Sequence, residues 1–163
     1  MIQRGYLNQL PFSARSFVAV FIMVLSVGYA SGLAFVDNTT SSHPSGIVEN
    51  YNGNEENEEA EEMKFKKSDH EMLNIVHTHI LSMSIIFFIL GSLVYGTRLS
   101  SRWQAFLMIE PLLSVLVTFG GIFLLWRGHT WMVYVVMVSG ALMTISFVLS
   151  SLMILYNCLK PHP

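Results

Sequence analysis

An all-α fold, an integral membrane four-helix bundle, is predicted for this 163-residue chain by three features of its sequence. The hydrophobic share is 52% and the charged share only 12%, whereas a soluble domain has about 25% charged residues. Four apolar runs are each long enough to cross a bilayer, which needs about 20 helical residues. Only short turns separate the last three runs, so those spans are expected to be antiparallel neighbours.

The acidic residues are gathered in one part of the chain. Ten of the eleven lie between Asp37 and Glu71, and the remaining one is Glu110. The net charge of -2 therefore comes from a single acidic segment, and no basic patch indicates nucleic-acid binding. The single cysteine, Cys158, excludes an internal disulfide, and no Cys-x-x-Cys motif points to thiolate-bound zinc or covalently attached haem.

The first membrane span is expected at residues 17–36, after a cytoplasmic N-terminal segment at residues 1–16. Arg4 and Arg15 precede the span, and no charged residue occurs within it. A cleaved signal peptide is the alternative, because residues 28–30 have the small-x-small pattern of a cleavage site. The apolar sequence continues past that pattern to the end of the span, which favours an uncleaved anchor.

Residues 37–72 form a polar, low-complexity segment that is rich in Asn, Ser and Glu. Such a composition buries too little apolar area to offset the entropy lost on ordering. We therefore expect a disordered acidic linker outside the membrane, between the first and second spans.

The other three spans follow in close succession. They are expected at residues 73–95, 105–126 and 131–156, separated by turns at 96–104 and 127–130 and followed by a tail at 157–163. The start of the third span is open, because Ser100 or Ser101 suits a helix cap whereas Pro111 suits the first turn of a helix.

The orientation in the membrane follows from the basic residues that flank the spans. With the N-terminus inside, five basic residues lie on the inner side, namely Arg4, Arg15, Arg98, Arg102 and Lys160. Four lie on the outer side, namely Lys64, Lys66, Lys67 and Arg127. This bias predicts that both termini are cytoplasmic.

Polar residues within the third and fourth spans are the strongest candidates for a site. A carboxylate inside a span is expensive and indicates function by default, and successive residues of a helix lie about 100° apart. We expect one polar face on each span, and we expect the two faces to meet at the bundle centre. Their members are Glu110, Ser114, Thr118, Ser139, Ser146 and Ser150, and matching depth would bring Glu110 near Ser150, Gly91 and Ser92.

Three interpretations of Glu110 remain open. In the first, its carboxyl group hydrogen-bonds to hydroxyl groups and fixes helix packing. In the second, it binds or relays a proton or a cation. In the third, Pro111 starts the span, and Glu110 lies at the interface beside Arg98 or Arg102.

Three histidines are expected on one side of the membrane and form a second candidate site. His77 and His79 lie early in the second span, and His129 lies in the turn before the fourth. Imidazole is a ligand for copper and iron, so a copper or haem site is one hypothesis. Residues two apart on a helix point about 200° away from each other, so hydrogen bonding at the interface is the other.

These patterns predict a small multi-pass membrane protein with the lipid bilayer as its surroundings. The first functional hypothesis is a non-enzymatic accessory, scaffold or assembly subunit that contacts other membrane protein subunits. The alternative is a redox or metal protein that uses His77, His79 and His129, with an intramembrane proton or cation site at Glu110.

Overall fold

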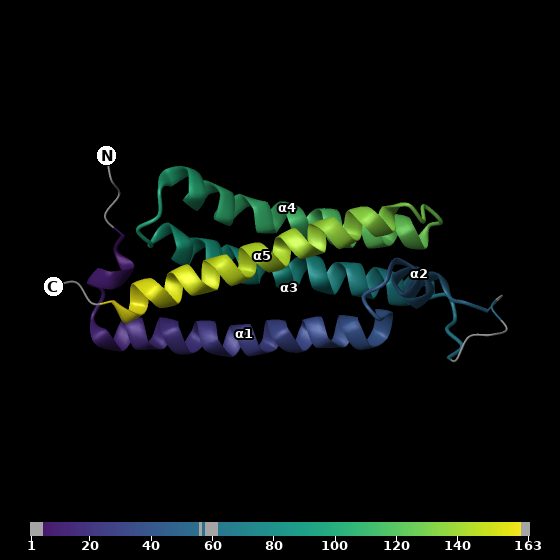
Figure 1. Cartoon of the computed structure of the whole chain (residues 1–163), viewed down its shortest axis with the longest axis horizontal. Helices are drawn as coiled ribbons and strands as arrows, with labels where there is room; N and C mark the ends of the chain where they lie inside the picture. The colour runs from purple at the N-terminus through teal and green to yellow at the C-terminus, as the bar shows by residue number, and fades with distance from the viewer. Residues whose placement is uncertain (1–4, 56, 58–61, 161–163) are drawn as a thin grey trace.

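The protein is an all-helical membrane bundle, as the sequence predicts. The computed structural model describes residues 5–55, 57 and 62–160. The elements are a short 3-10 helix, η1 (Leu7–Gln9), and the helices α1 (Phe12–Thr40), α2 (Pro44–Asn52), α3 (Asp69–Tyr95), α4 (Ser101–Trp126) and α5 (Met132–Leu159) (Figure 1). Within the described part of the chain, four of these helices, α1, α3, α4 and α5, are long and apolar enough to cross a membrane.

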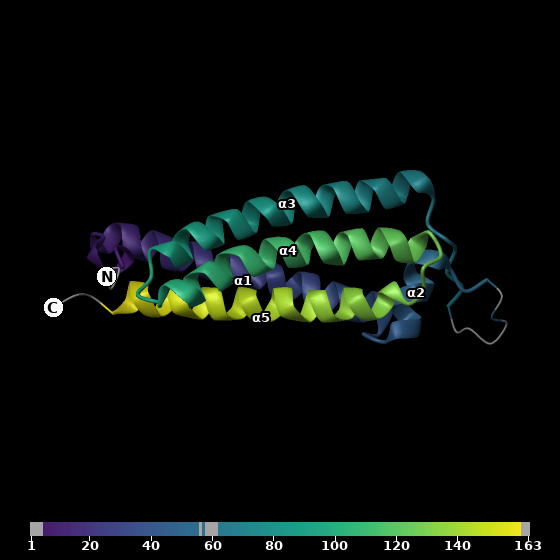
Figure 2. The same ribbon diagram turned by 90° about the horizontal axis from the view of Figure 1, so that it is seen from above.

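Two of the four spanning helices form the centre of the bundle. α4 and α5 pack against each other, α3 packs mainly against α4, and α1 packs against α5 and α2 (Figure 2). Within the most apolar stretch of each helix, 44% of the residues of α4 and 39% of those of α5 are buried, against 11% in α3 and 6% in α1. The outer faces of α1 and α3 are therefore the main lipid-facing surfaces.

The second and third spanning helices begin at serine caps. Ser68 precedes α3, and its side chain and that of Glu71 form a reciprocal capping box. Ser100 precedes α4, so the helix begins at Ser101 and the turn is shorter than expected. Pro111 lies inside α4 and is buried; since proline has no N–H, the carbonyl of Leu107 loses its usual helical donor.

The prediction of a disordered linker over residues 37–72 is wrong for much of that segment. α1 continues to Thr40, and residues 44–52 form α2. Ile47 of α2 joins an apolar cluster with Leu125, Met132 and Val133 at the end of α4 and the start of α5. The few apolar residues of the linker can therefore be buried against the ends of α4 and α5. The average composition of the segment does not reveal this. The part of this prediction that concerns residues 56 and 58–61 lies outside the described residues.

Hydrogen bonds also attach the linker to this end of the bundle. The Asn52 side chain donates to the carbonyl of Leu125 at 3.0 Å, and the Trp126 indole donates to the carbonyl of Lys67 at 2.8 Å. Burial raises the pKa of the Tyr51 phenol in α2 above its ordinary value of 10.0. These contacts satisfy a carbonyl group in the last turn of α4 and hold the linker on one face of the molecule.

Both described ends of the chain lie at the opposite end of the bundle from α2 (Figure 1). The Leu7 amide donates to the carbonyl of Gly96 at 3.1 Å, so η1 covers the turn between α3 and α4. The Arg15 guanidinium donates to the carbonyl of Cys158 at 3.2 Å and joins α1 to the end of α5. Residues 5–16 of the N-terminal segment are therefore packed on the bundle rather than extended from it.

Candidate functional site

The centre of the α4–α5 interface holds a carboxyl group between two hydroxyl groups. The Ser114 hydroxyl donates to Oε1 of Glu110 at 2.5 Å from the same helix. The Ser146 hydroxyl donates to Oε2 of Glu110 from α5. Both serines are buried and Glu110 is half-buried. Each carboxyl oxygen therefore has a hydrogen-bond partner inside the bundle.

This cluster lies deep in the membrane-spanning part of the bundle. Glu110 is nine residues beyond Ser101, which is about 14 Å along the helix at 1.5 Å per residue. Ser146 lies near the middle of α5. The interpretation of Glu110 as an interfacial residue is therefore wrong, because α4 begins at Ser101 and the carboxyl oxygens accept hydrogen bonds from serines inside the bundle.

Two further pairs of hydroxyl groups cross the helix interfaces on the α2 side of this cluster. The hydroxyls of Thr118 and Ser139 are 2.7 Å apart between α4 and α5. The hydroxyls of Tyr29 and Thr144 are 3.1 Å apart between α1 and α5. The Tyr29 ring stacks on a phenylalanine of α5, Phe147, at 4.0 Å between centroids, and the Tyr29 phenol is close enough to Glu110 for an electrostatic interaction.

The structure differs from the sequence prediction in the partner that Glu110 finds on α5. Glu110 bonds to Ser146, whereas Ser150, one turn farther along, is fully buried and its hydroxyl has no partner. Gly91 of α3 packs against Met108 of α4, and a Cβ on this glycine would lie 3.6 Å from the Met108 Cα. Ser92 is exposed and bonds to the carbonyl of Phe88 in its own helix.

The three candidate histidines do not form a shared site in this structure. The Nδ1–H group of His79 donates a hydrogen bond at 2.8 Å to the carbonyl of Ile75, and the His79 ring stacks on Phe119. His77 and His129 are exposed, and among the described residues no group of three His, Cys, Asp or Glu side chains is placed to hold a metal. Copper or haem binding stays a prediction. Purified protein with bound metal or a Soret band, which His79→Ala then loses, would confirm it.

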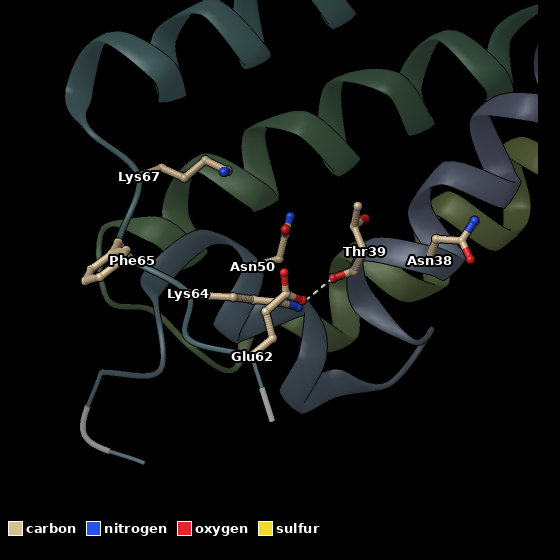
Figure 3. A pocket seen from close by; sticks show the side chains of 7 residues that line it. All are labelled: Asn38, Thr39, Asn50, Glu62, Lys64, Phe65 and Lys67. Carbon is tan, nitrogen blue, oxygen red and sulfur yellow. Dashed lines mark hydrogen bonds between the residues drawn. The ribbon is translucent and has the colours of Figure 1, made fainter. Parts of the chain in front are cut away.

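A polar hollow of about 330 Å³ lies outside the bundle, between the end of α1, α2 and the segment before α3 (Figure 3). The Lys64 ammonium donates to the carbonyl of Thr39 across it at 2.8 Å. The lining residues are Asn38, Thr39, Asn50, Glu62, Lys64, Phe65 and Lys67. Sequence reasoning missed this hollow because it treated residues 37–72 as disordered, and no residue pattern marks it.

Sequence reasoning also missed the contribution of α1 to the polar centre. Tyr29 is one of the few residues of α1 that can hydrogen-bond within the membrane, and it lies near the middle of that helix. Thr144 lies at a similar depth on α5. A search for hydroxyl residues at matching depth on the first and fourth spans could have found this pair.

Comparison with known proteins identifies one related family. A family model described as a transmembrane helical domain matches residues 41–163. The matched region begins one residue after α1 ends and contains α2, α3, α4 and α5. No curated protein and no solved structure matches the chain.

Proposed function

This chain belongs to the Aq_1264_TM family of transmembrane helical domains, and we propose that it serves as a non-enzymatic accessory, scaffold or assembly subunit in its membrane. Its lipid-facing helices make it a multi-pass membrane protein in contact with the bilayer. The proposed role is to hold another membrane protein through one of these helices. The proposal rests on the position of α1 in the bundle.

α1 is the least buried of the spanning helices. It contacts α5 along one face and α2 near its end, and most of its remaining surface is exposed. It also precedes the region that the family model matches. A helix added at the edge of a membrane domain is well placed to pack against a helix of another protein.

An exposed part of α1 has the residues that close helix packing requires. Gly28 and Gly32 form a G-x-x-x-G motif, and both are exposed. A Cβ built on either glycine would meet no atom within 4 Å. Small residues at this spacing let two transmembrane helices approach closely, which is a main source of helix association in lipid.

The proposal can be tested by substitution of these two glycines in the native membrane. Gly28→Ile and Gly32→Ile should each remove a membrane protein that co-purifies with the chain in mild detergent, because the added side chain keeps the helices apart. Gly140→Ile is the matched control, since this α5 glycine also has no atom within 4 Å of an added Cβ. Quantitative mass spectrometry of the purified complex gives the partner yield.

A photo-crosslinking side chain at Leu33, which is 44% exposed on α1, provides an independent readout. It should form a crosslink to the same partner, and Gly32→Ile should abolish it. A monodisperse monomer without a crosslinked partner would refute the proposal, and so would a crosslink only between two copies of this chain.

A further inference from the structure

We propose that Glu110, with the hydroxyl groups of Ser114 and Ser146, forms an intramembrane binding site for one monovalent cation, a proton or an alkali cation such as Na⁺. The proposal does not depend on the role of α1. It rests on the hydrogen-bond pattern of the cluster, on the charges at its depth and on the unused oxygen atoms beside it.

The arrangement of the cluster suits a negatively charged group. Each oxygen of Glu110 accepts a bond from a serine hydroxyl, and an ionised carboxylate is an acceptor only. A charge at this depth is costly unless it is balanced. The two hydroxyl groups orient the carboxylate but carry no charge that balances it.

Among the described residues, no basic side chain lies in the middle of the bundle where it could balance this charge. No Lys, Arg or His occurs in residues 16–40, 80–97, 103–126 or 130–159, which form most of the four spanning helices. Of the elements packed around Glu110, α1 contributes Tyr29, whereas α3 and α5 contribute no titratable side chain at that depth. The balancing positive charge must therefore come from outside the protein.

Oxygen atoms suited to a small cation lie on the same two helices as the carboxylate. The hydroxyl oxygens that donate to Glu110 keep their lone pairs. Ser150 lies one turn beyond Ser146 on α5, is 0% exposed, and has a hydroxyl without a partner. Pro111 leaves the carbonyl of Leu107 without its helical donor. Oxygen ligands of this kind suit hard cations rather than soft ones.

Modification with a carbodiimide tests the site in the full-length protein. Dicyclohexylcarbodiimide dissolves in the bilayer and reacts with a protonated carboxyl group, so labelling of Glu110 reports whether the group holds a proton. The mass of the peptide that contains residue 110 gives the labelled fraction. Glu110→Gln should lose the labelling completely.

Added salt distinguishes the two cations. Reactions at one pH and constant ionic strength are compared in Na⁺, K⁺ and choline. Protection by Na⁺ alone, with a rise in the midpoint of thermal unfolding that Glu110→Gln lacks, assigns an alkali cation. Labelling that is the same in all three salts assigns a proton.

Two serine variants test whether the labelling of Glu110 depends on the contacts of the site rather than on the fold as a whole. Ser146→Ala should change the labelled fraction or its dependence on Na⁺, because it removes a donor to the carboxylate. Ser92→Ala should leave both unchanged, since the Ser92 side chain is exposed and bonds only to the carbonyl of Phe88 in its own helix. No labelling of Glu110 in any of the three salts in a folded protein, or labelling that Ser146→Ala leaves unchanged, would overturn the proposal.

Discussion

At the scale of single residues, hydroxyl groups determine how the helices are aligned. Glu110 with Ser146, and Thr118 with Ser139, join α4 to α5, and Tyr29 with Thr144 joins α1 to α5. Hydrogen bonds between membrane helices contribute about 0.6 kcal/mol on average and about 1.7 kcal/mol at most. Their main effect is therefore to select one register among alternatives that pack equally well in lipid.

The role of Glu110 in packing can be separated from its charge by two substitutions. Glu110→Gln keeps a polar group that can bond to Ser146, whereas Glu110→Ala leaves this buried hydroxyl without its partner. An unsatisfied buried group costs about 1–3 kcal/mol. We expect the alanine variant to lose that much more free energy of unfolding than the glutamine variant in a reversible titration with denaturing detergent. Equal losses in the two variants would show that the hydrogen bond does not matter.

The helical repeat alone predicts which residues of the site share one face of a helix. It does not predict which residues of the neighbouring helix they contact. The spacing of Glu110, Ser114 and Thr118 put them on one face, and the structure places that face against Ser139 and Ser146. Matching depth predicted only that Glu110 lies near Ser150, whereas its hydrogen-bond partner on α5 is Ser146, one turn earlier. The register between two antiparallel helices depends on how their side chains interlock, and the repeat of a single helix carries no information about that.

At the scale of elements, a glycine of α4 allows a close approach to α5. A Cβ on Gly121 would lie 2.9 Å from Cγ2 of Val136 in α5, whereas a Cβ on the adjacent Gly120 would meet no atom within 4 Å. Glycine at this position allows the backbone of α4 to lie against a branched side chain. The adjacent glycines thus occupy two different environments, one in the interface and one outside it.

This difference provides an internal control for the α4–α5 contact. Gly121→Leu should lower the free energy of unfolding by about 1–3 kcal/mol, which is the usual effect of overpacking an interface. Gly120→Leu should change it little, because its added side chain points into free space. The two variants are compared by thermal unfolding in the same detergent, and a similar shift in both would mean that α4 and α5 do not pack in this way.

α2 shows why the average composition of a segment is a poor guide to its structure. The linker is acidic overall, but Ile47 lies in a nine-residue helix with Pro44 at its start and Gly53 after its end. Proline at the start and glycine after the end are typical helix boundary signals. The surface at the end of α4 and α5 that receives this helix exists only in the folded bundle, so the sequence could predict the helix but not its contacts.

At the scale of the whole molecule, the four spans have unequal roles. α4 and α5 contain the polar centre, and α1 and α3 expose most of their surface to lipid. The acidic linker and the turn before α5 lie at one end of the bundle, and both described ends of the chain lie at the other (Figure 1). The sequence predicts the number of spans because each is a long apolar run, and the balance of basic residues then predicts the orientation.

The most direct test is the accessibility of single cysteines in sealed cells, with Cys158→Ala as the background. A membrane-impermeant maleimide is applied to variants with cysteine at Gln9, Met63, Ser100 or Thr130, which are all exposed. Four spans with cytoplasmic termini predict labelling at residues 63 and 130 only, and labelling at residues 9 and 100 only after the cells are opened. Labelling of residues 9 and 63 from the same side, or of residues 100 and 130 from the same side, would contradict the four-span arrangement.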